Sequence, residues 1–192
     1  KRIGEADHAL RRGWNEARTN LMGRDLLEKT IGIIGLGNTG SRVAEICKLA
    51  FKCKILAHDP YIKESSFEKK HAIKTELDDL LANSDVISVH IPLNKETNNM
   101  IDKSWFQKMK KDSYFVTTAR GSIHNEEDLY NSLHQNHLAG AGLDVWDYEP
   151  PPSNHKLLKL ENVVASPHTA GVTVDSRNKM SEFVATQLLD IF

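Results

Sequence analysis

Three ionisable side chains follow expected strands and could act together. Arg120 follows SYFVTTA, Glu149 stands before a run of prolines, and His168 follows NVVASP. A guanidinium can hold a carboxylate through two parallel hydrogen bonds. A histidine can transfer a proton near neutral pH, and a carboxylate beside it can orient the ring and stabilise its cation. With a nicotinamide cofactor to carry the hydride, these groups would have the chemistry needed to reduce a 2-keto acid.

Each of these side chains also has a purely structural explanation. Arg120 could pair with a surface acid, His168 could be a hydrogen-bonded histidine at a strand end, and Glu149 could be an ordinary loop acid. The placement of all three after strands favours a shared site, because ligands of parallel sheets bind beyond the carboxyl ends of the strands.

A glycine-rich turn supplies the expected cofactor site. Gly35-Leu36-Gly37-Asn38-Thr39-Gly40 lies between the apolar run TIGIIGL and an amphipathic segment. In a G-x-G-x-x-G turn the first glycine permits the tight bend, the second lets the backbone approach a pyrophosphate, and the third allows close packing of helix on strand. The helix start, at Asn38 and Thr39, then offers free N–H groups to the phosphates.

Asp59 predicts which dinucleotide binds there. It ends the next expected strand, 19 residues after Gly40, where an acid that binds the ribose hydroxyls is expected. A carboxylate there would repel a 2′-phosphate, and the following Pro60 and Tyr61 bring no arginine, so NAD is favoured over NADP. The alternative is a tight turn followed by a surface aspartate.

The elements that must position these residues alternate along the chain. Strands are expected at 30–36, 54–58, 71–75, 85–91, 113–118, 138–145 and 162–166. Helices are expected at 3–14, weakened or ended by Gly13, at 38–52 and 77–83, after the caps Asp102 and Asn125, and around Met180, Phe183, Val184, Leu188 and Ile191. Short apolar strands alternating with helices predict an α/β fold, a doubly wound, Rossmann-like parallel sheet.

Composition excludes several classes of function. The 192 residues favour one domain, and 25 basic against 26 acidic residues leave a net charge of -1, so no nucleic-acid or membrane partner is expected. No apolar run reaches 18 residues. Cys47 and Cys53 are too few for a four-ligand zinc site and fit a cytoplasmic, reducing compartment, and no metal site is expected. The charged clusters at 63–71 and 108–112 are expected to be solvated faces or loops.

The motifs resemble the nucleotide-binding domain of the D-isomer-specific 2-hydroxyacid dehydrogenases. The carriers are LMGRDLLEKTIGIIGLGNTGSRVA, DVISVHIPLNKETNNMI, FVTTARGSIHNEEDL, LAGAGLDVWDYEPPP and NVVASPHTAG, which run through nearly the whole chain. The resemblance implies that Arg120 binds substrate, that His168 is the acid/base and Glu149 its partner, and that Asp144 lies beside the nicotinamide amide. The full set of expected cofactor contacts is Gly35, Gly37, Asn38, Thr39, Gly40, Asp59, Pro60, His90, Pro92, Thr97, Thr118, Ala119, Arg120, Asp144, His168 and Ala170.

The resemblance also implies an organisation. Residues 1–192 would be an NAD-binding domain, with an interdomain or dimerisation helix and connector at 1–29 and the core with a returning helix at 30–192. A homodimer through this domain is implied, with Trp14 either reaching the partner's active site or packing in the core. WFQKMK and SNHKLLKLENV look closest to glyoxylate/hydroxypyruvate reductases. Thr117 and His124 depart from the family pattern, which commonly has Asn and an apolar residue there.

The family's separate substrate-binding domain is not expected in this chain, so the chain would bind NAD without turning over alone. Its substrate would be a 2-hydroxy/2-keto acid of the hydroxypyruvate, glyoxylate or phosphoglycerate type, which the sequence does not distinguish. The alternative function is an NAD-sensing interaction module, because corepressors called C-terminal-binding proteins share the fold and retain the catalytic residues. A requirement for a partner peptide would discriminate the two.

Overall fold

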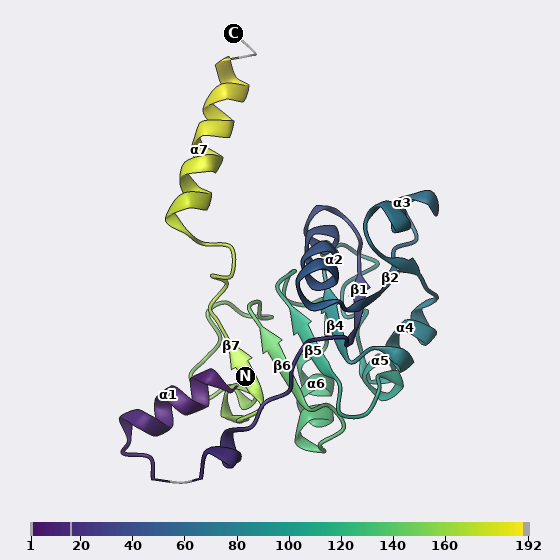
Figure 1. The fold of residues 1–192 in the computed structure, drawn as a ribbon. Helices are drawn as coiled ribbons and strands as arrows, with labels where there is room; N and C mark the ends of the chain where they lie inside the picture. Colours follow the sequence, from purple (N-terminus) through teal and green to yellow (C-terminus); the bar gives the residue numbers. More distant parts are fainter. Residues whose placement is uncertain (1, 16, 190–192) are drawn as a thin grey trace.

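The structure, a computed structural model that describes residues 2–15 and 17–189, is built around one parallel sheet (Figure 1). The sheet has seven strands in the order β3-β2-β1-β4-β5-β6-β7. This confirms the predicted α/β fold and the predicted number of strands, although most strands are shorter than expected. Their bounds are β1 Thr30–Ile34, β2 Lys54–His58, β3 Ile73–Lys74, β4 Val86–Val89, β5 Tyr114–Thr117, β6 Gly140–Leu143 and β7 Val163–Ala165.

Helices cover the sheet unevenly. Two apolar clusters show the layers. One joins β1 and β2 to α2 and α3. The other joins the opposite face of β1 and β2, together with β4, β5 and β6, to α4, α5 and α6. Predicted caps Asp102 and Asn125 each accept backbone N–H bonds at the start of a helix. The bounds are α1 Ile3–Arg11, α2 Asn38–Phe51, α3 Ser65–Lys69, α4 Leu77–Asn83, α5 Lys103–Lys108, α6 Glu126–His134 and α7 Val174–Leu189, with short 3-10 helices η1 Arg18–Leu21 and η2 Lys156–Lys159.

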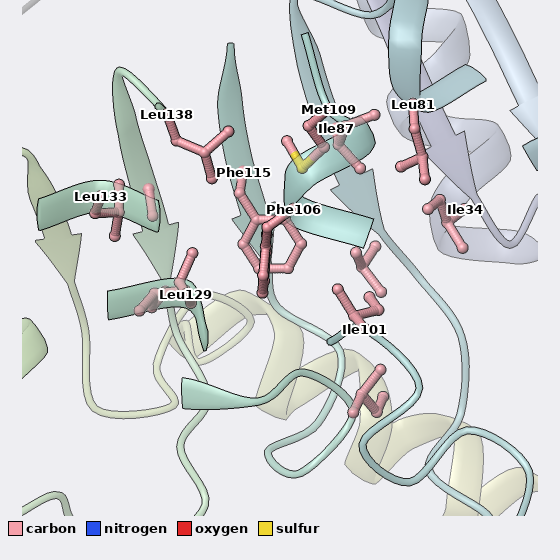
Figure 2. Close-up of a cluster of buried hydrophobic side chains, with 14 of the residues drawn as sticks. Ile34, Leu81, Ile87, Ile101, Phe106, Met109, Phe115, Leu129, Leu133 and Leu138 are labelled. Carbon is pink, nitrogen blue, oxygen red and sulfur yellow. The ribbon is translucent and has the colours of Figure 1, made fainter. Parts of the chain in front are cut away.

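The larger cluster lies under β4, β5 and β6. Phe106 of α5 meets Phe115 of β5 edge to face, with ring centroids 5.4 Å apart (Figure 2). Leu129 and Leu133 of α6 are buried in the same cluster. Truncating a buried Phe to Ala costs about 3–5 kcal/mol, so this contact layer makes a rigid base for the loops at the carboxyl end of the sheet.

One sequence expectation is corrected and another is confirmed. The charged segment 63–71 is not only a solvated face or loop, because it contains α3, whose Phe67 is 2% exposed and packs against β1 and β2. The first helix ends at Arg11, as expected from Gly13, which takes a left-handed φ of 81° just beyond the helix. Trp14 therefore lies beyond the helix, half-buried, and belongs to neither apolar cluster.

The helices nearest the two termini are not packed into the core. No residue of α1 or of the described part of α7 is buried, and α7 stands away from the sheet in Figure 1. Its apolar face includes Met180 and Phe183, which are 67% and 65% exposed. Ile191, expected on the same face, lies outside the described residues. No helix in the described part of the chain has the length and apolar character to cross a bilayer.

Candidate active site

The site forms where the strand order reverses. β1 pairs with β2 on one side and with β4 on the other. The connections that follow β1 and β4 therefore diverge beyond the carboxyl ends of these two strands. The loop after β1 begins with Gly35, and the loop after β4 begins with His90. A Cβ on Gly35, whose φ is 87°, would lie 2.7 Å from the His90 carbonyl oxygen. Only glycine suits this turn, so the two loops can approach closely.

The other two glycines of the turn have different surroundings. A Cβ on Gly40 would lie 2.0 Å from the Gly35 carbonyl oxygen, so α2 can approach β1 only with glycine there. A Cβ on Gly37 would meet nothing within 4 Å, and no side chain caps α2 at this residue. The first turn of α2 thus presents backbone N–H groups to open space, as a phosphate site requires.

Asp59 lies beside this turn. Its Oδ2 accepts the Leu36 N–H at 2.8 Å, and its Oδ1 accepts the Tyr61 N–H at 3.0 Å. A carboxylate has about four lone-pair positions, so capacity remains for ribose hydroxyls. Sequence reasoning missed Lys70, whose Nζ donates to the Leu36 carbonyl at 2.9 Å. No spacing rule points to it, because the fold of α3 alone returns Lys70 to the turn.

A cavity of about 510 Å³ collects six of the predicted cofactor contacts. His90 lines it, held by a 2.9 Å hydrogen bond between its Nε2 and Ser88 Oγ, and burial lowers the pKa of His90. Leu93 was not predicted, although it directly follows Pro92. Thr97 does not line the cavity but donates to the Pro92 carbonyl at 2.7 Å and so shapes its rim. The lining is Thr39, His90, Pro92, Leu93, Thr118, Ala119 and Arg120.

Arg120 is available for an anion. It is exposed in the loop that follows β5, and among the described residues its guanidinium donates only to the Ala119 carbonyl. Within residues 2–15 and 17–189, no carboxylate forms an ion pair with it. The alternative in which Arg120 pairs with a surface acid therefore has no support in the described chain.

Asp144 organises the loop that carries His168. The Asp144 carboxylate is 3% exposed and accepts from the Ser166 hydroxyl and from the amides of Thr169 and Ala170. Burial opposes ionisation, but these hydrogen bonds outweigh it and hold the pKa of Asp144 below its usual value. The Asp144 carbonyl also accepts the His168 N–H at 2.8 Å. Asp144 thus acts mainly on its own chain, and a contact with the nicotinamide stays a prediction.

Glu149 and His168 form the predicted pair. His168 Nδ1 lies 2.8 Å from Glu149 Oε2, and the side chains are 43% and 37% exposed. A carboxylate only accepts, so His168 Nδ1 must carry the proton, which leaves Nε2 for a substrate. The hydrogen bond from His168 lowers the pKa of Glu149. His168 has a φ of 55°, a strained value for a residue with a Cβ.

The Arg120 loop touches the loop that bears Glu149. A Cβ on Gly121 would lie 1.9 Å from the Trp146 carbonyl oxygen, and Ser122 N donates to Asp147 Oδ1 at 2.7 Å. These contacts hold the loops after β5, β6 and β7 against one another. In the described chain they carry Arg120, which has no ion-pair partner, and His168, which is hydrogen-bonded to Glu149. Among the described residues, no group of three or more His, Cys, Asp or Glu could hold a metal ion.

Comparisons with known proteins agree with this geometry. Residues 1–170 match the family model described as D-isomer specific 2-hydroxyacid dehydrogenase, NAD binding domain. A glyoxylate reductase of Korarchaeum cryptofilum is 40% identical over 193 residues, which cover 98% of this chain and 58% of that protein. A hydroxypyruvate reductase of Thermotoga maritima is 39% identical, covering 94% of this chain and 58% of that protein.

A solved structure shares the fold. The D-lactate dehydrogenase of Aquifex aeolicus, in complex with NAD and lactic acid, has a TM-score of 0.86 and 31% identity. The match covers 100% of this chain and 61% of that chain. The present chain thus spans less than two thirds of the length of each of these three relatives.

Proposed function

The chain belongs to the D-isomer-specific 2-hydroxyacid dehydrogenases, and from this premise we propose that it acts as the NAD-binding part of an oxidoreductase that interconverts a 2-hydroxy acid and its 2-keto acid. The observation that carries the proposal is the His168–Glu149 pair, whose Glu149 lies in a loop that contacts the Arg120 loop through Gly121. The Arg120 guanidinium has no ion-pair partner in the described part of the chain. Residues 1–29 would form the interdomain or dimerisation helix and connector, and 30–192 the core and returning helix.

The described residues fit a nicotinamide dinucleotide. The uncapped start of α2, with open space at Gly37, would hold the pyrophosphate, and Asp59 would accept the ribose hydroxyls. The cavity bounded by His90, Pro92 and Thr118 would hold the nucleotide farther along the sheet edge. Acceptance by Asp59 favours NAD, and a bound NADH supplies the hydride.

The protein's own groups would bind and protonate the substrate. The Arg120 guanidinium would donate two hydrogen bonds to the 2-keto acid carboxylate and draw electron density from the adjacent carbonyl. Nε2 of protonated His168 would give its proton to the forming alkoxide, and Glu149 would stabilise the imidazolium before this step. In the reverse direction His168 would remove the hydroxyl proton. Glyoxylate and hydroxypyruvate are the first substrates to test, because relatives named above reduce them.

A homodimer through this domain is part of the proposal. Tyr114 and Val116 of β5, Gly140 and Gly142 of β6 and Val164 of β7 line part of an open hollow of about 1160 Å³, and Val164 is 77% exposed. The exposed apolar faces of α1 and α7 would gain from burial against a second copy. Half-buried Trp14 would contact the partner. Val164→Glu is expected to convert a dimer to a monomer, measured by light scattering after gel filtration. An unchanged mass would contradict the proposed homodimer.

A cytoplasmic location is also proposed, supported by the unpaired thiols of Cys47 and Cys53. The alternative, an NAD-sensing interaction module, is less favoured because the named relatives are reductases and dehydrogenases.

The deciding experiment is a fluorescence titration with NADH and, in parallel, NADPH. Saturable binding that prefers NADH would support the cofactor site. Turnover of glyoxylate, hydroxypyruvate or pyruvate by a version that also carries the family's substrate-binding domain would then identify the reaction. A folded chain that binds neither cofactor would contradict the proposal. Binding of NADH that changes affinity for a partner peptide, without turnover, would favour the interaction module.

A further inference from the structure

The loop that carries Glu149 has no regular secondary structure of its own. Between the end of β6 at Leu143 and the start of η2 at Lys156, the chain holds its shape only through specific contacts. Trp146 N donates to Glu149 Oε1 at 3.1 Å, and the Trp146 indole N–H donates to the Ser166 carbonyl at 3.0 Å. Trp146 is 3% exposed, so its position decides where the Glu149 carboxylate lies.

A second carboxylate, not used in the proposed reaction, ties this loop to α6. Glu126 lies in the first turn of α6, and its side chain is 13% exposed. Its Oε1 accepts the Asp147 N–H at 3.0 Å, and its Oε2 lies 3.1 Å from His155 Nε2. Since a carboxylate only accepts, His155 Nε2 carries the proton of that bond. The Glu126 side chain therefore contacts the loop at Asp147 and at His155, one on each side of Glu149.

His155 adds a packing contact to the same loop. Its ring meets the Trp146 indole edge to face, with centroids 5.5 Å apart, and its side chain is 16% exposed. Its Nδ1 has no hydrogen-bond partner among the described residues. Burying an ionisable pair with an unsatisfied nitrogen costs desolvation free energy, and apolar residues of similar volume would pack as well without that cost. The hydrogen bond to the loop backbone is what apolar side chains could not supply.

We propose that Glu126 and His155 are a positioning pair that sets Glu149 and, through Glu149, the orientation and tautomer of the His168 ring. The connection runs from His155 to Glu126, along the backbone from the Asp147 N–H to the Trp146 N–H, then to Glu149 and on to His168. The proposal rests on the proposed function for its significance, but its first readout requires neither substrate nor cofactor.

The test uses this chain and observes the His168 ring nitrogens by two-bond ¹H–¹⁵N correlation NMR, at a pH where the ring is neutral. The wild type is expected to show one tautomer, protonated at Nδ1. Glu126→Ala is expected to give a mixture of tautomers and faster exchange of the Asp147 amide. Glu126→Gln, whose amide oxygen can still accept from Asp147, should recover most of the wild-type signal.

Glu127→Ala is the matched control. Glu127 is the next residue of α6 and pairs with Lys156, next to His155, but its side chain is 62% exposed. Among the described residues, no hydrogen bond or ion pair joins it to the loop at 144–155. Removing it should leave the His168 signal unchanged. An equal change in Glu126→Ala and Glu127→Ala, or an unchanged tautomer in folded Glu126→Ala, would overturn the proposal.

His155→Phe keeps the proposal testable if Glu126→Ala does not fold. Phe retains a ring against Trp146 and removes only the bond to Glu126, so the same tautomer mixture is expected, to a smaller degree. A single Nδ1–H tautomer in folded His155→Phe would then refute the pair. Because NADH binding by the wild type is measured separately, loss of the proposed function and loss of the positioning role give different results.

Discussion

Replacing His124 by leucine should stabilise the protein, and increasingly so as the pH falls. His124 is 1% exposed, its ring packs against Phe115 with centroids 5.6 Å apart, and neither ring nitrogen has a hydrogen-bond partner among the described residues. Burial lowers the pKa of His124 from 6.5 to about 4, against the opposing attraction of Asp147. Leucine has nearly the same volume and leaves no unsatisfied polar atom. At pH 7.5 the gain should be about 1–2 kcal/mol.

The acid dependence follows from proton linkage. Above pH 6.5 His124 is neutral in both states and its titration costs nothing. Between pH 6.5 and about 4 the unfolded chain binds a proton at His124 that the folded chain does not. The free energy of unfolding of the wild type therefore decreases as the pH falls, by roughly 1.4 kcal/mol per pH unit. At pH 4.5 the loss is about 2.5 kcal/mol, so His124→Leu should exceed the wild type by about 4 kcal/mol.

Urea unfolding followed by circular dichroism at pH 7.5, 6.0 and 4.5 measures this difference. The carboxylates titrate in both proteins and cancel, which isolates His124. His134→Gln, at an exposed histidine of α6, is the control and should keep the wild-type pH dependence. A stability difference between His124→Leu and wild type that is the same at all three pH values would refute the reasoning, as would a destabilised variant at pH 7.5.

The other predictions concern the cofactor and substrate sites. Asp59→Ala should weaken NADH binding about tenfold and reduce discrimination against NADPH, and fluorescence titrations with unchanged affinities for both would remove the ribose assignment. In a version of the protein that also carries the family's substrate-binding domain, Arg120→Ala should lower turnover of a 2-keto acid by about 10²- to 10³-fold while NADH still binds, measured by NADH oxidation and by titration; retained turnover would contradict its carboxylate role. Gly40→Ala should prevent correct folding, because its Cβ would lie 2.0 Å from the Gly35 carbonyl oxygen, whereas Gly37→Ala should fold normally and lose NADH affinity. Equal melting temperatures for these two glycine variants would contradict the assignment of roles.

The order of strands and helices was predictable because both have a period that is visible in the sequence. The run TIGIIGL, buried on both faces, could only be an interior strand, and β1 indeed lies between β2 and β4. The segment 63–71 misled the prediction because one aromatic side chain among charges carries little periodicity. Phe67 becomes core only because α3 packs across β1 and β2. The first helix also forms where its apolar stripe predicts it, but none of its residues is buried in the described chain.

The site was predictable in part for a similar reason. Gly35, Gly37, Gly40 and Asp59 have a fixed spacing because one β-α-β unit of nearly constant geometry positions them. Lys70 and Leu93 have no such spacing and enter the site through tertiary packing.

By itself, the sequence determined which local elements form and which chemical groups follow the strands, because both depend on neighbours within a few residues. Tertiary structure alone decided which of those groups meet. Arg120 proved to be free of any acid in the described chain, Glu149 was set at 2.8 Å from His168, and Glu126 was joined to His155 across 29 residues of sequence. These distances depend on the register of parallel strands and on loop packing, and no pattern of adjacent residues encodes them.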